Sequence, residues 1–394
     1  MVCSFPSAEQ PERSIFNLRA AKQLQKFVDI EVIFPRAWLP GRKPLSQYEI
    51  DGIKVNMLAI PQIPITSTIN LFLYQHLGWN HVRPLLESCD IVHSVYADGP
   101  GILASLWARR ADRHHVMQII GCDVNLVLDQ NRAYRKFNNW SQNVNGVIAV
   151  SNTIAREYTQ LYPDTKNIRT IYRGTDLSKF NPDGSLEESI AQREPVRFFY
   201  TGGFDGSNIL KRGLYDVKGG AFLVEAWRLA EEKLNAAGAS IVLAGVNSDS
   251  IALRKLQSSL SHPKIFHLIG SIEPEDVPKY MRASDVIVLP SLREGLPNVG
   301  QEALACGKAI IGSDVGGMSE LVIESETGHL VPPKDPAALA EALVIAAINP
   351  EEVANMGIKA RQRAGELLNN HKFAPAVVEL YREVLSEPIK SEQN

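Results

Sequence analysis

The sequence predicts two α/β domains, each built on a doubly wound parallel sheet. Three observations indicate this fold class. The chain has 394 residues, more than one compact core usually holds. Short β-branched runs alternate with helical patterns along most of it, as expected for βαβ units. A polar stretch with two prolines, at 179–196, interrupts the alternation once and divides it into two series.

The first series contains four short apolar runs that are typical of buried strands. They are DIEVIF (29–34), DIVHSV (90–95), HVMQII (115–120) and GVIAVS (146–151). Helical patterns separate them, such as GPGILASLWARRA at 99–111. These elements predict an N-terminal domain over residues 1–182.

The second series has five such runs, each ending in Gly, Pro or Ser. They are RFFYTGG (197–203), ASIVLAG (239–245), KIFHLIG (264–270), DVIVLP (285–290) and KAIIGS (308–313). They predict a second domain over residues 196–371. Because parallel strands end at one edge of a sheet, we expect ligands at that edge, in a cleft between the domains.

Charge and cysteine content indicate which partners, metals and cellular compartments to expect. Net formal charge is −3, but residues 1–180 carry 20 Lys and Arg against 15 Asp and Glu (+5), and the rest carries 21 against 29 (−8). Either this asymmetry is chance, or the first domain meets an anionic lipid or glycan. We expect no nucleic acid partner. Four cysteines without CxxC spacing argue against zinc and disulfides and suit a reducing cytoplasm.

Membrane signals are weak. No apolar run reaches the roughly 20 residues of a spanning helix, and the N-terminus lacks a signal-peptide pattern. We expect a cytoplasmic protein, either free or peripheral on the inner face of the membrane. The segments INLFLYQHLGW (69–79) and RRADRHH (109–115) are candidates for an apolar-plus-basic patch, although core packing is the simpler explanation of the first.

The stretch SLREGLPNVGQEALACG, at 291–307, places two carboxylates around a glycine-bearing loop. Glu294 follows a predicted strand. Asn298, with a glutamine three residues later, has the spacing of a capping box, so a helix is expected with Asn298 as its N-cap. Glu302 then lies in the first or second turn, and Gly307 ends the helix.

This loop offers the parts that a nucleotide sugar needs. Free N–H groups at the helix start suit a diphosphate, and Gly295 and Gly300 let a ligand approach the backbone. Carboxylates on either side suit hydroxyl groups. The simpler alternative stays open: Glu302 only complements the helix dipole, and Glu294 is a solvated loop acid.

Residues 285–333, DVIVLPSLREGLPNVGQEALACGKAIIGSDVGGMSELVIESETGHLVPP, resemble the donor-binding signature of glycosyltransferase family 4, which comprises retaining enzymes of the GT-B fold. The spacing Glu294-x7-Glu302 is that family's hallmark. Further matches include VKGG at 217–220 and LAGVNSD at 243–249. The resemblance implies two Rossmann-like domains facing across a cleft, with a C-terminal helix at 372–388 packing back onto the first.

The resemblance also implies roles for single residues. Glu294 would bind the donor sugar, Glu302 the ribose and Lys218 the diphosphate. Asp123 would touch the donor sugar, unless it is a helix cap or loop residue. Further donor contacts would come from Gly203, Phe204, Ser271, Ile272, Gly295, Leu296, Pro297, Asn298 and Val299, and acceptor contacts from His93 and Tyr96.

The implied reaction moves a sugar, with retention, from a nucleotide sugar to a glycan or lipid-linked acceptor in polysaccharide or cell-surface glycan synthesis. UDP is the commoner donor nucleotide. Lys218 and helix dipoles would stabilise charge on the leaving nucleotide, so no metal or other cofactor is expected. Glu294 would position the sugar, because the acceptor hydroxyl uses the diphosphate as its base.

The chain departs from the family pattern near the donor phosphates. Members usually carry an arginine where this chain has Gly203 and Phe204. The insertion DGSNILKRGLYD follows at 205–216. We expect Lys211 or Arg212 from this insertion to supply the absent cation, unless it is only a solvated surface loop.

Other departures leave alternatives open. Val95 stands where the family often has a second histidine, and Ile120 stands where it commonly has His or Arg. His93 is either an acceptor contact or a packed histidine. The short opening MVCSF suggests that the chain starts several residues earlier. A nucleotide-sugar-binding subunit without turnover is one alternative. A phosphorylase or sugar-nucleotide epimerase is another, although no pyridoxal-phosphate lysine motif is evident.

Overall fold

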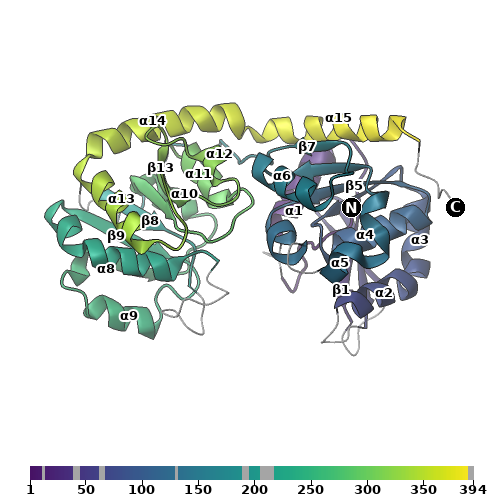
Figure 1. The fold of residues 1–394 in the computed structure, drawn as a ribbon, viewed down its shortest axis with the longest axis horizontal. Coiled ribbons are helices and arrows are strands. Elements are labelled where there is room, and N and C mark those ends of the chain that lie inside the picture. The colour runs from purple at the N-terminus through teal and green to yellow at the C-terminus, as the bar shows by residue number, and fades with distance from the viewer. Residues whose placement is uncertain are drawn as a thin grey trace. The chain divides into compact units, whose positions relative to one another are not determined.

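A computed structural model of the chain describes residues 1–10, 14–38, 45–61, 67–128, 132–188, 195–204 and 217–388. The chain forms two compact units (Figure 1). The first comprises Met1–Arg173 and His371–Asn394, and the second comprises Gly174–Asn370. None of the helices in the described segments combines the length and hydropathy that a bilayer-spanning helix requires.

The chain enters the second unit earlier than residue 182, where the sequence places the end of the first domain. Thr175 forms a parallel bridge with Asn369, near the end of the second unit. The carbonyl of Phe180, a buried residue, accepts a 3.4 Å hydrogen bond from Arg361. These contacts attach residues 174–182 to the second unit.

The sheet of the first unit is parallel except for β2, which runs antiparallel to β3. Its strands are β1 (Glu31–Ala37), β2 (Leu45–Ile50), β3 (Ile53–Ile60), β4 (Ile91–Val95), β5 (His114–Ile119), β6 (Gly146–Ala149) and β7 (Ile168–Thr170). They form the groups β1-β3-β2 and β4-β5-β6-β7. Val2 joins the groups, because it bridges Ile33 of β1 and Ser94 of β4. The first segment of the chain therefore lies inside the sheet.

Helices cover both faces of this sheet. Those described in the first unit are α1 (Ile15–Leu24), α2 (Ser67–Leu77), α3 (Trp79–Glu87), α4 (Gly99–Arg110), α5 (Arg132–Lys136), α6 (Asn152–Leu161) and α15 (Phe373–Ser386), with a π-helical turn at Asp123–Leu128 and a 3-10 helix at Phe137–Asn143. Met117 of β5 packs in one cluster with Ile102 and Trp107 of α4. The adjacent Val116 packs in another with Val377 of α15. Since neighbouring strand residues point to opposite faces, α4 and α15 lie on opposite sides of the sheet.

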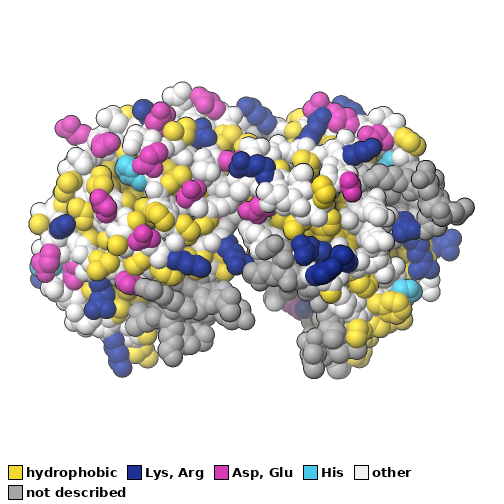
Figure 2. Space-filling model, in the orientation of Figure 1, with side chains coloured by type: hydrophobic (Ala, Val, Ile, Leu, Met, Phe, Trp, Pro, Cys, Tyr) yellow, Lys and Arg dark blue, Asp and Glu magenta, His cyan; other side chains and the backbone are white. Residues whose placement is uncertain are grey.

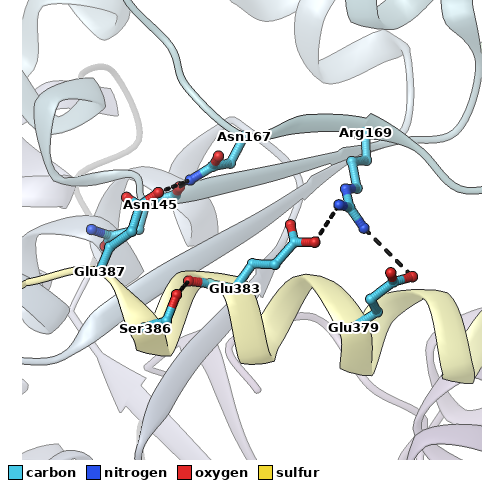
Figure 3. A network of polar contacts seen from close by, with 7 residues as sticks. All are labelled: Asn145, Asn167, Arg169, Glu379, Glu383, Ser386 and Glu387. Atoms are coloured by element: carbon cyan, nitrogen blue, oxygen red, sulfur yellow. Dashed lines mark hydrogen bonds and ion pairs between the residues drawn. The ribbon is translucent and has the colours of Figure 1, made fainter.

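Apolar packing and ion pairs hold α15 on the first unit. Val384 is fully buried in the cluster that α15 shares with the sheet. Arg169 of β7 pairs with Glu383 through Nη2 and lies 3.7 Å from Glu379 through Nη1 (Figure 3). The helix falls within 372–388, the range expected to return to the first domain.

The second unit contains a six-stranded sheet in which every pairing is parallel. Its strands are β8 (Val196–Tyr200), β9 (Ala239–Ala244), β10 (Phe266–Gly270), β11 (Val286–Leu289), β12 (Ala309–Ser313) and β13 (Gly328–Val331). Their order is β10-β9-β8-β11-β12-β13, so the chain winds outward in one direction from β8 and in the other from β11. Sheets wound in this way bind ligands at the crevice where the order reverses, here between β8 and β11.

Large aromatic side chains fill the core beside this sheet. The helices described in the second unit are α8 (Gly220–Ala236), α9 (Ile251–Ser258), α10 (Val277–Ala283), α11 (Asn298–Ala305), α12 (Met318–Leu321), α13 (Pro336–Ile348) and α14 (Pro350–Leu367), with 3-10 turns at Pro263–Ile265 and Asn370–Lys372. Trp227 of α8 packs on Phe198 and Phe266, with ring centroids 6.2 and 5.9 Å away. Arg197 binds Asp285 through two hydrogen bonds of 2.8 and 2.9 Å, which fixes the start of β8 beside the start of β11.

Candidate active site

Glu294 lies on the loop that follows β11, at the crevice of the second unit. Its Oε1 accepts hydrogen bonds from Ser291 Oγ at 2.8 Å and from Lys218 Nζ at 2.7 Å. The Glu294 side chain is 11% exposed, whereas the Lys218 side chain is 50% exposed. The carboxylate is therefore fixed in place, and the ammonium group beside it remains open to solvent. No sequence pattern indicates this role of Ser291.

Two glycines enclose the loop that carries Glu294. Gly316 has φ +54°, and a Cβ there would lie 1.8 Å from the Glu294 carbonyl oxygen. Gly219 has φ +72°, and a Cβ there would lie 1.8 Å from the Pro290 carbonyl oxygen. Glycine is thus required on both sides of the loop. Neither role was predicted, although the paired glycines in VKGG and DVGG are the signal that could have indicated them.

The helix after this loop does not begin as predicted. The N-cap of α11 is Pro297 (φ −65°, ψ 125°), so the expected capping role of Asn298 is wrong. Proline fixes φ and has no N–H to leave unpaired, which favours it at the boundary. Asn298 becomes the first helical residue, and its Oδ1 lies 3.4 Å from Gln301 Nε2. The N-cap residue Pro297 has no side chain that can cap the first turn, so the N–H groups there can bind an anion.

The predicted diphosphate loop, residues 295–299, is mostly held by its neighbours. Gly295 accepts a 2.7 Å hydrogen bond at its carbonyl oxygen from Gly317 N. Gly295, Leu296 and Pro297 are buried, Asn298 is exposed and Val299 is half-buried. Asn298 and Val299 are therefore the members that reach the surface.

Gly300, Glu302 and Gly307 are the other positions of the stretch 291–307 for which the sequence predicted a role. Glu302 lies in the second turn of α11 and is half-buried. Gly300 packs on α12, because a Cβ there would lie 2.8 Å from Leu321 Cδ1, so its small size serves helix packing where ligand access was expected. Gly307, with φ +67°, follows the C-cap residue of α11, and its predicted role in ending the helix is confirmed.

Gly203 and Phe204 follow β8 and take part in packing. A Cβ at Gly203 (φ +69°) would lie 2.9 Å from the backbone of Val246. Phe204 is buried, with its ring centroid 5.5 Å from that of Tyr200, and its N–H donates to the Val246 carbonyl at 2.7 Å. This placement gives the Phe204 side chain a core position. The expected cations of the insertion, Lys211 and Arg212, lie outside the described residues.

Ser271 and Ile272 follow β10 at the same edge of the sheet as Glu294, because the strands are parallel. Ser271 is exposed and Ile272 is half-buried. Their contact with the donor base stays a prediction.

In the first unit, Asp123 joins the loops that follow β4 and β5. Its Oδ2 accepts the N–H of Ala97 at 2.7 Å, and its Oδ1 accepts the N–H groups of Gly121 at 2.7 Å and Ile120 at 3.1 Å. Burial raises the pKa of Asp123, although these hydrogen bonds oppose the shift. A buried carboxylate with these partners positions backbone, which is the loop role that the sequence left open beside sugar contact.

Asp98, beside Asp123, is a carboxyl group that the sequence analysis missed. It is the N-cap residue of α4, but its side chain makes no capping hydrogen bond. Its Oδ1 is buried and has no partner among the described residues. Burial, and secondly the charge of Asp123, raise the pKa of Asp98 to about 7. This group therefore titrates near neutral pH.

The two predicted acceptor contacts have different environments. His93 is buried, and its Nδ1 shares a hydrogen bond with the Tyr381 hydroxyl of α15. Burial lowers the pKa of His93 to about 3, so its ring is neutral. This geometry is that of a packed histidine. Tyr96 follows β4 with φ +79° and is half-buried, so it stays within reach of a ligand.

Two family descriptions match the chain. "Glycosyltransferase Family 4" matches residues 10–179, and "Glycosyl transferases group 1" matches residues 208–348. The chain belongs to glycosyltransferase family 4. It is therefore a glycosyltransferase, and the Glu294 and Glu302 spacing belongs to its matched C-terminal half.

Known proteins resemble this glycosyltransferase over most of its length. TuaC of Bacillus subtilis, a glycosyltransferase assigned provisionally to teichuronic acid biosynthesis, is 25% identical over 358 residues, or 86% of each chain. Sucrose-phosphate synthase from Thermosynechococcus elongatus has a TM-score of 0.71 at 20% identity, covering 98% of this chain and 96% of that one. HepE of Anabaena, solved with UDP, has a TM-score of 0.71 at 14% identity, covering 97% and 100%. The predicted GT-B fold is confirmed.

Gly316→Ala should displace the Glu294 loop of this glycosyltransferase, because the new Cβ would overlap a carbonyl oxygen in a left-handed backbone conformation. We expect the free energy of unfolding to fall by roughly 1–3 kcal/mol in urea denaturation. Gly365→Ala is the matched control, because no atom lies within 4 Å of a Cβ at this helical position. Equal stability of the two variants would contradict the steric role of Gly316.

Asp98→Asn should stabilise the protein at high pH only. The folded pKa of about 7 lies above the ordinary value of 3.8, so ionisation of Asp98 destabilises the folded state as pH rises through this window. We expect equal stability at pH 4 and a gain of about 1–3 kcal/mol at pH 8 in denaturant unfolding. Asp90→Asn, at an exposed site, should show no such pH dependence. A gain for Asp98→Asn that is the same at both pH values would refute the titration.

Proposed function

We propose that this enzyme is a retaining glycosyltransferase that moves a sugar from a nucleotide sugar, in the simplest case a UDP-sugar, to a glycan or lipid-linked acceptor in polysaccharide or cell-surface glycan synthesis. The observation that carries this proposal is the Lys218–Glu294 pair at the crevice of the second unit, beside the uncapped start of α11. The UDP complex of HepE supports the donor class, and the provisional pathway of TuaC supports the product class.

The donor-side groups divide into anion binders and hydroxyl binders. A diphosphate needs cations and N–H donors, which Lys218 and the first turn of α11 supply. Sugar and ribose hydroxyls need acceptors, and the carboxylates of Glu294 and Glu302 are suited to them. The two sets lie on one continuous segment after β11, except for Lys218, which lies before α8.

Lys218 changes its principal partner when the donor binds. Without a ligand, its ammonium group and the Ser291 hydroxyl share Glu294 Oε1. A diphosphate attracts the ammonium group, which leaves part of the carboxylate free to accept a sugar hydroxyl. Ser291 keeps the carboxylate in position during this exchange. The ion pair of the free protein thus prepares both groups for the donor.

The transfer step places its charge on the nucleotide. The bond between the anomeric carbon and the phosphate oxygen breaks, and a bond to the acceptor oxygen forms on the same face of the sugar. The acceptor proton passes to a phosphate oxygen. Lys218 and the α11 N–H groups stabilise the negative charge that develops on the leaving nucleotide, so this scheme uses no metal. Glu294 orients the sugar and forms no covalent bond.

The two carboxylates should separate in a mutational test, with the donor first identified by a thermal-shift screen of UDP-, GDP- and ADP-sugars. Glu302→Ala should lower the affinity for the nucleotide sugar and for the free nucleotide alike, by roughly 10- to 100-fold, because the ribose is common to both. Glu294→Ala should spare the free nucleotide and lower turnover by a similar factor. Calorimetry and a transfer assay give these values. Glu275→Ala, at an exposed acid, is the control.

An equal loss of free-nucleotide affinity in Glu294→Ala and Glu302→Ala would contradict this assignment. Retained affinity in both variants would contradict the donor site as a whole.

The first unit also has a surface suited to peripheral membrane contact. One face of α2 is exposed and apolar, with Ile69, Phe72 and Leu77 between 45% and 53% exposed. Figure 2 shows hydrophobic side chains gathered in the region of α2. Trp79 lies just beyond the end of α2. The exposed Arg110 lies over its ring, with Cζ 4.2 Å from the ring centroid. An apolar face with basic neighbours suits an anionic membrane surface.

The second basic segment contributes less to this surface than the sequence suggested. His114 and His115 belong to β5 and are buried, and Arg113 donates hydrogen bonds to the carbonyls of Leu86 and Glu87. These three residues serve the fold of the first unit.

Phe72→Ser combined with Leu77→Ser should weaken binding to vesicles that contain anionic lipid, by at least about tenfold, because two exposed apolar side chains are lost. Liposome flotation measures this effect. The matched control is Ile251→Ser with Ile358→Ser, which removes two isoleucines of the second unit that are 75% and 71% exposed. The proposed membrane contact through α2 is contradicted if the wild-type protein shows no salt-sensitive flotation, or if both double variants bind vesicles equally well.

A further inference from the structure

The first unit has its own point of strand-order reversal. Val2 pairs with β1 on one side and with β4 on the other, so the sheet winds outward in both directions from this first segment. Doubly wound sheets bind ligands at the carboxyl ends of the two strands that flank such a point. Ser4 follows the first segment and Tyr96 follows β4, so both lie at this position.

Hydroxyl and amide groups meet there. Ser4 Oγ and Ser14 Oγ share a hydrogen bond of 2.6 Å. Asn17, which is fully buried, donates from Nδ2 to the Ser4 carbonyl at 2.9 Å. The Tyr96 hydroxyl interacts with both serines. The side-chain oxygen of Asn17 makes no bond to these serines and accepts from Arg173 instead.

Arg173 adds a positive charge to these groups. Its Cζ lies 4.9 Å from the centroid of the Phe16 ring, and its Nη2 lies 3.4 Å from Asn17 Oδ1. Its Nε is buried without a hydrogen-bond partner among the described residues, and no ion pair joins Arg173 to a described carboxylate. The guanidinium group is oriented by neutral neighbours and has donors to spare.

No described carboxylate forms a direct ion pair with Arg173. Burial lowers the pKa of Arg173 to about 10, and the charge of Asp123 partly opposes this shift. The side chain therefore stays charged at neutral pH. Both oxygens of Asp123 already accept backbone N–H groups. A partly buried cation without a counter-ion is unfavourable, and an anionic ligand removes that cost.

Resting on the proposed function, we propose that the acceptor carries a phosphate or a carboxylate, which this first-unit anion site binds. The site is defined as Ser4, Ser14, Asn17, Tyr96 and Arg173. The planar fork of a guanidinium group matches two oxygens of either oxyanion. Phe16 and Asn17 fix the plane of that fork, and the three hydroxyl groups can donate to the remaining oxygens or accept from the sugar.

The test measures acceptor preference in the full-length protein with UDP present. Glucose 6-phosphate, glucuronic acid and glucose are the probes, and NMR titration gives their dissociation constants. The wild-type protein should bind at least one anionic probe about tenfold more tightly than glucose, or better. Comparison of the two anionic probes decides between a phosphate and a carboxylate.

Arg173→Gln should abolish this preference, a loss of roughly 10- to 100-fold in the affinity for the anionic probe relative to glucose. Arg173→Lys should keep part of it, because the charge remains and the fork is lost. Arg169→Gln is the matched control, since this arginine is four residues earlier and already paired with Glu379 and Glu383. It should retain the wild-type preference.

If Arg173→Gln does not fold, Phe16→Leu replaces it. Loss of the ring face beneath the guanidinium group should lower the preference roughly two- to fivefold. A wild-type protein that binds no anionic probe more tightly than glucose overturns the proposal, and so does an unchanged preference in Arg173→Gln, or in Phe16→Leu where it is used. UDP affinity is measured separately: its absence refutes the donor site, whatever the acceptor preference.

Discussion

The close approach of backbone segments around the β11 loop is the constraint on which the candidate donor site depends. Gly219 and Gly316 leave no room for a Cβ on either side of the loop, so its path is set by packing of main chain on main chain. Ser291 and Lys218 then restrict the Glu294 side chain within that path. A binding group held in this way loses little entropy when the ligand arrives.

The same constraint links the site to the sheet. The Arg197–Asp285 pair fixes where β8 and β11 begin, and both strands are buried. The loops at their other ends therefore start from fixed positions. Lys218 and Glu294 are 76 residues apart in sequence, yet their side chains meet because these two strands are neighbours in the sheet.

Much of the second unit was readable from the sequence because its signals are local. A buried strand, a loop acid, a helix and a terminating Gly307 follow one another in a single stretch, and each obeys its own short-range rule. The prediction of Asn298 as N-cap was wrong because Pro297 and Asn298 are both favourable residues at a helix start. The fixed φ of Pro297 placed the boundary one residue earlier. Gly300 was expected to admit a ligand, and its small size also serves packing on Leu321, 21 residues later, a contact that no local pattern indicates.

The polar core of the first unit was less predictable, because its contacts are distant in sequence. His93 is bonded to Tyr381, 288 residues away, and no local pattern indicates that α15 brings a hydroxyl group to this strand. The raised pKa of Asp98 likewise depends on Asp123, which lies on another loop. Burial of a polar group depends on the finished tertiary structure, whereas strand and helix patterns depend on neighbours along the chain.

Lys218 and Arg173, one in each unit, differ in how their charges are balanced. Lys218 already has a carboxylate partner, so under the proposed function a diphosphate would compete with Glu294 for it, and the net gain in charge interaction would be reduced. Arg173 has no such partner among the described residues, so the proposed oxyanion would displace no carboxylate there. The side-chain types fit these situations. A flexible ammonium group can move between two anions, whereas a guanidinium group held over a ring suits one oxyanion in one orientation. Ligand binding at Arg173 should therefore stabilise the first unit, while exchange at Lys218 redistributes charge that the second unit already balances.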